Sequence, residues 1–268
     1  MPDDSDQYSN LLYKTCTTQT FRSSNHAQAL SSFFQDLLAQ SSQSKFFKTT
    51  AGDENGAVSG LFQCRGDLSN NECQTCITTL SHLSNSLCPQ SVSVRFHLPG
   101  CYVLYEAEGL TGVSNGDEDR HENVHKTCRG GKVVGREFEE MRDGGFAAME
   151  SGMWKMMSKD GFYSVDYQLV RVMAQCQGDL LRHVCDCGEC VSSALEIVSE
   201  ECGGSVSGQV YLDKCFAGYT YYPYGIPDEK KNGDNTRKSV AIVLGGAAAL
   251  IFGFIFFLVL KNLGKKDD

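Results

Sequence analysis

The residues with the most chemistry in this chain are its cysteines, and their spacing is duplicated. Twelve of the 13 cysteines form two sets of six, with gaps of 47, 8, 2, 11 and 12 residues in the first set and 47, 10, 2, 11 and 12 in the second. The first set comprises Cys16, Cys64, Cys73, Cys76, Cys88 and Cys101, and the second comprises Cys128, Cys176, Cys187, Cys190, Cys202 and Cys215. Even cysteine sets in small modules are typical of disulfide frameworks. The sequence therefore predicts a tandem repeat of two disulfide-stapled modules.

Zinc binding is the alternative chemistry for these thiols. Cys73 and Cys76, and again Cys187 and Cys190, have the C-x2-C spacing of a zinc site. A four-thiolate site needs a second close pair, and the other cysteines of each set stand singly along the chain. The spacing therefore favours disulfides and predicts no structural metal.

A second chemical motif is the string H-E-N-V-H, which places His121, Glu122 and His125 in the pattern of zinc metalloproteases. That chemistry needs both histidines on one face of a buried helix, with the glutamate as general base. Here the string follows the polar SNGDEDR, has no apolar stripe beside it and ends three residues before Cys128. We interpret it as part of an interdomain linker.

Cys185 is the cysteine left over, and it falls where the second copy carries two additional residues between Cys176 and Cys187. His183 is near, but residues two apart cannot form a catalytic dyad without a third group that orients the base. The prediction is an unpaired thiol in an exposed loop. The chain also has no P-loop or kinase signature. It is therefore predicted to have no catalytic residues and no cofactor.

Charge and hydropathy indicate where the chain acts. The formal charge of −9 argues against nucleic acid as a partner. Residues 239–260 are 22 uncharged, mostly apolar residues, which is long enough to span a bilayer. We expect a type I protein with extracellular modules and a cytosolic tail at 261–268. The start of the chain has no apolar signal sequence, so we expect the mature form behind an added methionine.

The cysteines must be positioned by both helices and strands. Apolar residues repeat at helical spacing over 26–40, with Ser24 or Asn25 placed to cap, and a second helix is expected after each C-x2-C. Residues 92–98 alternate as in a strand, and 101–106, 208–212 and 215–222 also read as strands. Each module is thus predicted to be α+β, an antiparallel sheet with two helices. We expect modules at 8–107 and 125–222, a linker at 108–124 and a stalk at 223–238.

The run Cys64-x8-Cys73-x2-Cys76, with its distant Cys16 and trailing Cys88 and Cys101, resembles the plant ginkbilobin-type cysteine-rich module, also called domain of unknown function 26. The resemblance covers roughly 8–107 and 120–222. Secreted relatives end after the modules, and receptor-like kinases add a membrane helix and a kinase. The short tail after the apolar span makes this chain similar to the plasmodesmata-located proteins.

The resemblance implies which cysteines are joined, whereas spacing alone allows 15 connectivities in each module. It pairs the first cysteine with the fifth, the second with the third and the fourth with the sixth. In this chain the implied pairs are Cys16–Cys88, Cys64–Cys73, Cys76–Cys101, Cys128–Cys202, Cys176–Cys187 and Cys190–Cys215.

The resemblance also implies a candidate glycan site. The founding antifungal member binds mannose through an Asn just after the first cysteine, an Arg six residues before the last and a Glu five residues after it. The first module keeps Arg95 and Glu106 but has Thr17 in place of the Asn. The second module has Arg129, Gln209 and Thr220 at these positions. Arg95 and Glu106 are equally well explained as a charge pair on neighbouring strands.

By resemblance, the protein is expected at plasmodesmata in the plasma membrane, where it restricts cell-to-cell traffic by promoting callose. The alternative is a receptor-like ectodomain that senses an apoplastic ligand in plant defence. Partners are expected to be other copies or relatives, bound through the membrane helix. Gly245, Ala249 and Gly253 recur every four residues there and allow two helices to approach closely. An extracellular ligand of unknown identity is also expected.

Overall fold

The computed structural model describes residues 10–21, 23–53, 56–107, 123–158, 161–182 and 184–227. Residues 1–226 form one compact unit. The predicted membrane span at 239–260, with Gly245, Ala249 and Gly253, lies outside the described residues, as do the tail and most of the stalk. In the part of the chain that is described, no helix is long and apolar enough to cross a membrane.

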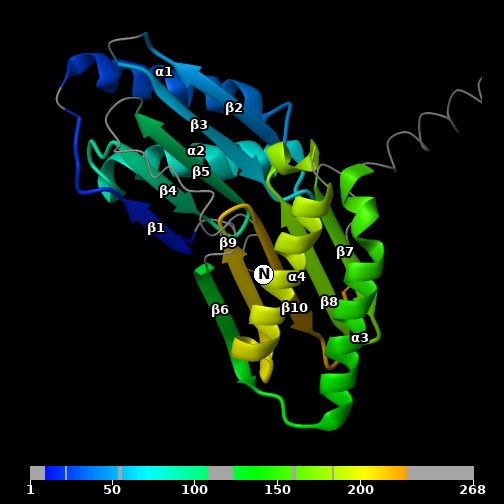
Figure 1. The fold of residues 1–268 in the computed structure, drawn as a ribbon. Coiled ribbons are helices and arrows are strands. Elements are labelled where there is room, and N and C mark those ends of the chain that lie inside the picture. The colour runs from blue at the N-terminus through cyan, green and yellow to red at the C-terminus, as the bar shows by residue number, and fades with distance from the viewer. Residues whose placement is uncertain are drawn as a thin grey trace, which may run out of the picture. The chain divides into compact units, whose positions relative to one another are not determined.

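The described elements repeat in the same order after the linker (Figure 1). The first copy consists of β1 (Tyr13–Cys16), α1 (Ser24–Ser41), β2 (Phe46–Ala51), β3 (Val58–Cys64), α2 (Asn70–Leu87), β4 (Ser93–His97) and β5 (Cys101–Ala107). The second consists of β6 (Asn123–Lys132), α3 (Arg136–Gly152), the 3-10 helix η2 (Met153–Ser158), β7 (Phe162–Tyr167), β8 (Val170–Cys176), the 3-10 helix η3 (Gly178–Arg182), α4 (Val184–Cys202), β9 (Ser205–Leu212) and β10 (Cys215–Tyr221).

Each copy builds a five-stranded antiparallel sheet. The strand order is β1-β4-β5-β3-β2 in the first sheet and β6-β9-β10-β8-β7 in the second. The predicted α+β class, with two helices on each antiparallel sheet, is confirmed. Strand β6 already begins at Asn123, which pairs with Leu212 of β9, two residues before the predicted start of the second module.

The helices form where apolar residues recur at helical spacing. In α1 the buried side chains include Phe33, Phe34 and Leu37, which face the sheet. Its cap differs from the prediction: Ser23 precedes the helix, and its hydroxyl pairs with Nδ1 of His26 (2.8 Å) instead of a backbone N–H. Helix α2 starts with a capping box, in which Ser69 and Glu72 bond each other's backbone N–H groups.

A buried tyrosine holds the same place in each core. Tyr105 of β5 makes edge contacts with Phe33 and Phe34 of α1. Tyr219 of β10 packs edge to face with Phe146 of α3, and its hydroxyl donates to the Cys202 carbonyl (2.6 Å). A large aromatic ring at the centre of the helix–sheet contact contributes much of the buried apolar area of each module.

The six disulfides are the pairs implied by the family resemblance. In the first copy all three bridges tie α2, or the residue just after it, to a strand: Cys88 to β1, Cys73 to β3 and Cys76 to β5. The second copy ties α4 to β6, β8 and β10 in the same way. One helix in each module is therefore covalently fixed to the sheet, while α1 and α3 carry no disulfide.

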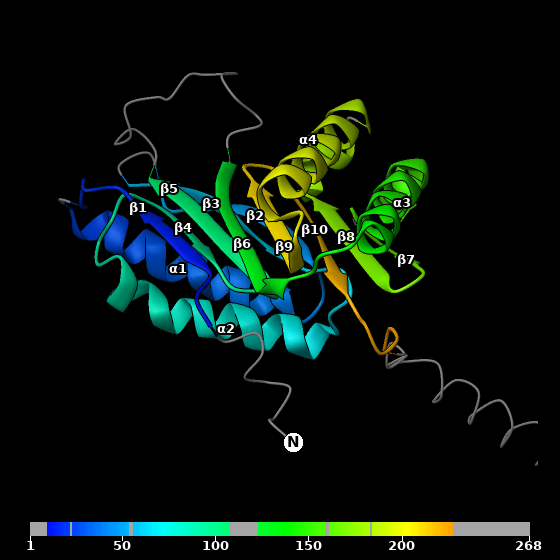
Figure 2. The same cartoon turned by 90° about the horizontal axis from the view of Figure 1, so that it is seen from below.

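The helices cover one face of each sheet, and no helix of the same module covers the other face. Figure 2 shows α1 and α2 on one side, α3 and α4 on the opposite side, and both sheets between them. Residues from the helix-free faces of the two sheets contact each other near the strand ends that carry Cys64 and Cys176. The two modules thus meet through polar strand positions that point away from their cores.

Candidate functional site at the junction of the modules

The junction is built around two glutamines that exchange equivalent hydrogen bonds. Gln63 of β3 and Gln175 of β8 each precede a bridged cysteine and are buried. Nε2 of Gln63 donates to the Cys176 carbonyl (3.0 Å), and Nε2 of Gln175 donates to the Cys64 carbonyl (3.1 Å). Because a buried amide without a partner is costly, these reciprocal bonds hold the two modules in one register.

Glycines on both sides make room for aromatic rings. A Cβ atom added to Gly66 would lie 2.4 Å from Cβ of Phe162, and one added to Gly178 would lie 2.4 Å from Cγ of Phe46. Each glycine follows the second cysteine of its module by two residues, and each phenylalanine begins an edge strand. The junction therefore has the pseudo-two-fold symmetry of the repeat.

Other contacts break this symmetry. The Arg95 guanidinium donates to both the carboxylate and the backbone carbonyl of Asp213. The Tyr102 hydroxyl donates to Oε1 of Gln177 (3.0 Å). At the equivalent places the second module has Gln209, whose Oε1 accepts from the Tyr211 hydroxyl, and Phe216, which has no hydroxyl to donate. The junction therefore contains contacts that the pseudo-two-fold symmetry of the repeat does not reproduce.

An aromatic cluster closes one side of the junction. His97 of β4 packs against Tyr13 of β1 and Tyr211 of β9, with ring centroids 5.1 and 4.6 Å apart, and its Nδ1 lies 3.1 Å from the Tyr13 hydroxyl. His125 of β6 stacks on Tyr13 from the other module at 4.9 Å. Burial, together with the charges of Arg95 and His125, lowers the pKa of His97 to about 3. Burial likewise raises the pKa of Tyr211.

This buried histidine predicts a pH dependence. Because the folded pKa of His97 lies below its ordinary value of 6.5, the unfolded chain binds one more proton between pH 6.5 and 3. The contribution of His97 is complete above pH 6.5, and the free energy of unfolding should fall by about 1.4 kcal/mol for each pH unit below it. Urea unfolding at pH 7, 6 and 5 measures the slope.

The control for this experiment is a ring that cannot be protonated. His97→Phe keeps an aromatic side chain in the cluster and should flatten the pH profile, whereas His82→Phe, on the exposed side of α2, should leave the profile unchanged. If the profile of His97→Phe runs parallel to that of the wild type, the acid sensitivity comes from another group.

The space left between the modules is small. A partly open cavity of about 30 Å³ is lined by residues of both modules, among them Arg95, Tyr102, Gln177 and Asp213. That volume suits about one water molecule and is far below the 300 Å³ or more typical of small-molecule sites. The junction has room for a bridging water but not for a sugar ring. Its geometry is that of an interface between the two modules.

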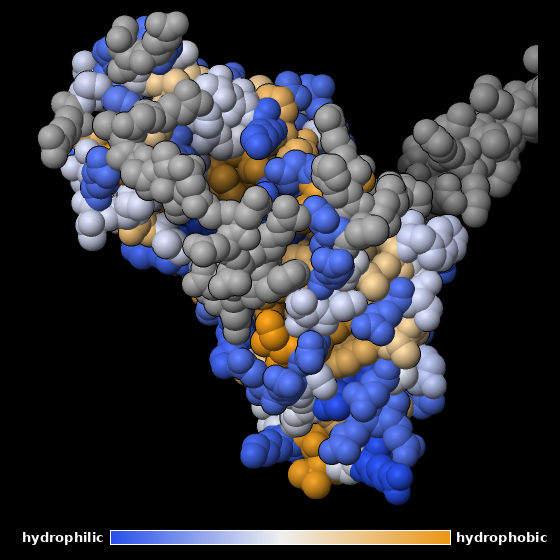
Figure 3. Space-filling model, viewed as in Figure 1, coloured by the Kyte–Doolittle hydropathy of each residue, from blue (hydrophilic) through white to orange (hydrophobic). Residues whose placement is uncertain are grey.

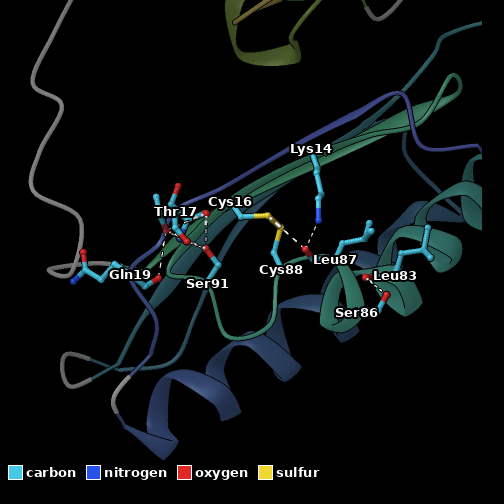
Figure 4. Close-up of a disulfide and its surroundings, with 10 residues drawn as sticks. Lys14, Cys16, Thr17, Gln19, Leu83, Ser86, Leu87, Cys88 and Ser91 are labelled. Carbon is cyan, nitrogen blue, oxygen red and sulfur yellow. Dashed lines mark hydrogen bonds between the residues drawn. A yellow bond between two sulfur atoms is a disulfide. The ribbon is translucent and has the colours of Figure 1, made fainter.

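The residues of the predicted glycan site lie on or beside adjacent strands of the first sheet, but two of them are engaged in contacts within the protein. Arg95 turns its guanidinium to Asp213 of the other module, and Glu106 lies on β5 opposite Ser93, exposed on the same sheet face. The Thr17 hydroxyl lies 3.0 Å from that of Ser91 and accepts from the Ser93 amide (3.1 Å). Figure 4 shows this cluster beside the Cys16–Cys88 bridge. Thr17 and Arg95 thus hold parts of the protein together, and glycan binding by Arg95 and Glu106 stays a prediction.

The H-E-N-V-H motif and Cys185 are the two other candidates for reactive chemistry. His121 and Glu122 are outside the described residues, and His125 lies in strand β6, whereas a zinc-binding H-E-x-x-H needs a helix. Cys185 is not in a loop, as predicted, but in the first turn of α4. The two additional residues are taken up before the helix, where the second module forms η3. The other 12 cysteines are bonded to one another.

Comparison with known proteins agrees with this duplicated architecture. The family model described as salt stress response/antifungal matches residues 15–108 and 127–222. Among curated proteins of Arabidopsis thaliana, plasmodesmata-located protein 2 is 41% identical over 98% of this chain and 90% of its own length. Plasmodesmata-located protein 4 is 40% identical over 97% and 90%.

Solved structures give the same result for the fold. The tandem ectodomain of the Arabidopsis cysteine-rich receptor-like protein PDLP8 superposes with a TM-score of 0.66 at 27% identity, covering 79% of this chain and 98% of that one. The tandem ectodomain of PDLP5 gives a TM-score of 0.67 at 25% identity, covering 80% and 100%. The chain belongs to the plasmodesmata-located proteins, a family with tandem salt stress response/antifungal modules.

Proposed function

We propose that this protein is a single-pass membrane protein of plasmodesmata, with both modules outside the cell, that restricts cell-to-cell traffic by promoting callose deposition. The observation that carries the proposal is the likeness to plasmodesmata-located protein 2 along 98% of this chain. The apolar span at 239–260 follows the second module after the stalk at 223–238 and supplies the membrane anchor.

The geometry of the modules supports a binding role over a catalytic one. The junction uses its arginine, histidines and glutamines to hold the modules together, and its cavity of about 30 Å³ has no room for a substrate. A rigid pair of modules suits recognition by an exposed surface. The protein therefore acts through partners engaged by its ectodomain or its membrane helix.

The membrane helix is the proposed site of self-association. Gly245, Ala249 and Gly253 recur at a spacing that places them on one helix face, and small residues there allow close packing between two helices. Lateral assembly of several copies, or of related proteins, is the proposed route by which the ectodomain acts at the channel neck.

Raising the amount of the protein in leaf epidermis tests this function. The expected result is more callose at plasmodesmata, seen by aniline blue, and spread of a mobile fluorescent protein into fewer neighbouring cells. Replacing Gly245, Ala249 and Gly253 with leucine should weaken both effects, because the helices can no longer approach closely. Gly246→Leu with Ala247→Leu, on other faces of the helix, is the control and should act like the wild type.

The competing function is that of a receptor-like ectodomain. The same overexpression experiment distinguishes the two functions. A fluorescent fusion spread evenly over the plasma membrane, with unchanged callose and unchanged spread of the mobile protein, would contradict the plasmodesmal function. It would favour an ectodomain that senses an apoplastic ligand.

A further inference from the structure

The negative charge of the described unit is concentrated on one helical layer. Helices α3 and α4 of the second module contain ten acidic and two basic residues. Helices α1 and α2 of the first module contain one acidic residue each. The two layers have the same fold, so the fold does not require this charge. The face of the molecule that carries α3 and α4 shows mainly hydrophilic residues, with smaller apolar areas between them (Figure 3).

A groove runs between these two helices. It has a volume of about 700 Å³ and an apolar floor that includes Phe146 of α3 and Leu195 of α4. Its carboxylates are Glu150 of α3 and Glu189, Glu196 and Glu200 of α4, with serines between them. A hollow of this size is within the range of sites that hold ligands or peptide side chains.

The three glutamates of α4 form a line along the groove. Glu189, Glu196 and Glu200 are separated by seven and four residues, which places them on one face of the helix. Because a helix rises 1.5 Å per residue, the line extends over about 16 Å. Charges spread over this length suit an extended ligand with several positive groups.

None of these four carboxylates forms a salt bridge or side-chain hydrogen bond with another described residue. Other acidic residues of the same layer do have cationic partners: Glu201 pairs with Lys126, and Glu140 with Arg136. In the described part of the chain, no three acidic, histidine or cysteine side chains are close enough to hold a metal ion. The groove carboxylates are thus unpaired, and they do not converge on a point.

The first module has other residues at the positions of the groove glutamates. With Cys76 and Cys190 as equivalent residues, the three glutamates of α4 correspond to Thr75, His82 and Ser86 of α2. Phe34 and Phe146 contact the equivalent tyrosines, and the residue four positions later is Leu38 in α1 but Glu150 in α3. Leu38 packs against the core of the first module. The acidic lining is therefore a property of the second module alone.

We propose that the groove between α3 and α4 docks a cationic peptide segment of another protein, with lysine or arginine side chains placed against Glu189, Glu196 and Glu200. The charge of the groove is complementary to such a segment, and its floor accepts the aliphatic stems of lysine and arginine. An extended peptide covers the 16 Å line with about five residues. This docking goes beyond the proposed effect on callose and does not require it.

The test uses full-length protein in neutral detergent and a fluorescein-labelled hexalysine peptide as the probe. Fluorescence anisotropy at low salt should show saturable binding that weakens as salt rises, because exposed charges are screened. Replacing Glu196 and Glu200 with glutamine removes two charges from the groove and should weaken binding about tenfold. Thermal unfolding of each variant checks that the modules remain folded.

The matched control removes the same charge elsewhere on this layer. Glu137→Gln with Glu139→Gln changes two exposed residues of α3 that do not line the groove, and binding should stay within about twofold of the wild type. Equal weakening by both double variants would mean that net charge attracts the peptide, and the proposal would fail. It would also fail if hexalysine does not bind saturably. Conversion of an oligomer into a monomer by the Glu196 and Glu200 variant would assign the groove to a second copy of this chain instead.

Discussion

Replacing Cys16 and Cys88 with alanine is expected to lower the free energy of unfolding by about 4 kcal/mol, whereas replacing Cys64 and Cys73 should lower it by about 2.6 kcal/mol. The first bridge closes a loop of 72 residues and the second a loop of nine. A longer closed loop removes more conformational freedom from the unfolded chain, so its loss costs more. Equilibrium unfolding in urea, without reductant, measures both values.

The second module supplies the control, because its bridges have almost the same loop lengths. Cys128 and Cys202 are 74 residues apart, so their replacement should cost the same as that of Cys16 and Cys88. If the short bridges prove the more important ones in both modules, then packing around the buried Cys64 and Cys176, and not the entropy of the unfolded chain, governs the effect.

The elements that the sequence predicts well are those with local periodicity. The helix that carries each C-x2-C follows from apolar residues at helical spacing, although it begins before the motif and not after it as predicted. The closing strands follow from the alternation in 92–98 and 101–106. Cys185 shows the limit of such reasoning. The position of the two additional residues is ambiguous when only the cysteines are aligned. The helix itself resolves it, because α2 and α4 both begin six residues before the second cysteine of C-x2-C.

The junction could not be predicted from local patterns. A polar residue that points outward from a strand, as Gln63 and Gln175 do, ordinarily faces water. Arg95 corresponds by resemblance to a sugar-binding arginine, and the local sequence around it is the same whether the side chain meets a ligand or another module. Two duplicated sequence features belong to the junction: a glutamine before the second cysteine of each copy, and a glycine two residues after that cysteine. They indicate the repeat, but only the packing of the two sheets explains them.

Replacing Gly66 and Gly178 together with valine is expected to separate the two modules while each remains folded. The added Cβ atoms would come within 2.4 Å of Phe162 and Phe46, and the branched side chains cannot be accommodated without moving the rings or the modules. The loss of contact would also leave Gln63 and Gln175 without their carbonyl partners. Calorimetry should then show two transitions in place of one cooperative transition.

Gly131→Val is the matched control, because nothing lies within 4 Å of a Cβ atom at that position in β6. It should retain a single transition and the wild-type midpoint. Limited proteolysis gives a second measurement: in the double glycine variant the linker at 108–122 should be cut faster, since the modules it joins no longer hold each other. A single transition with unchanged cleavage would contradict this prediction. It would mean that contacts other than those between the glycines and the phenylalanines hold the two modules together.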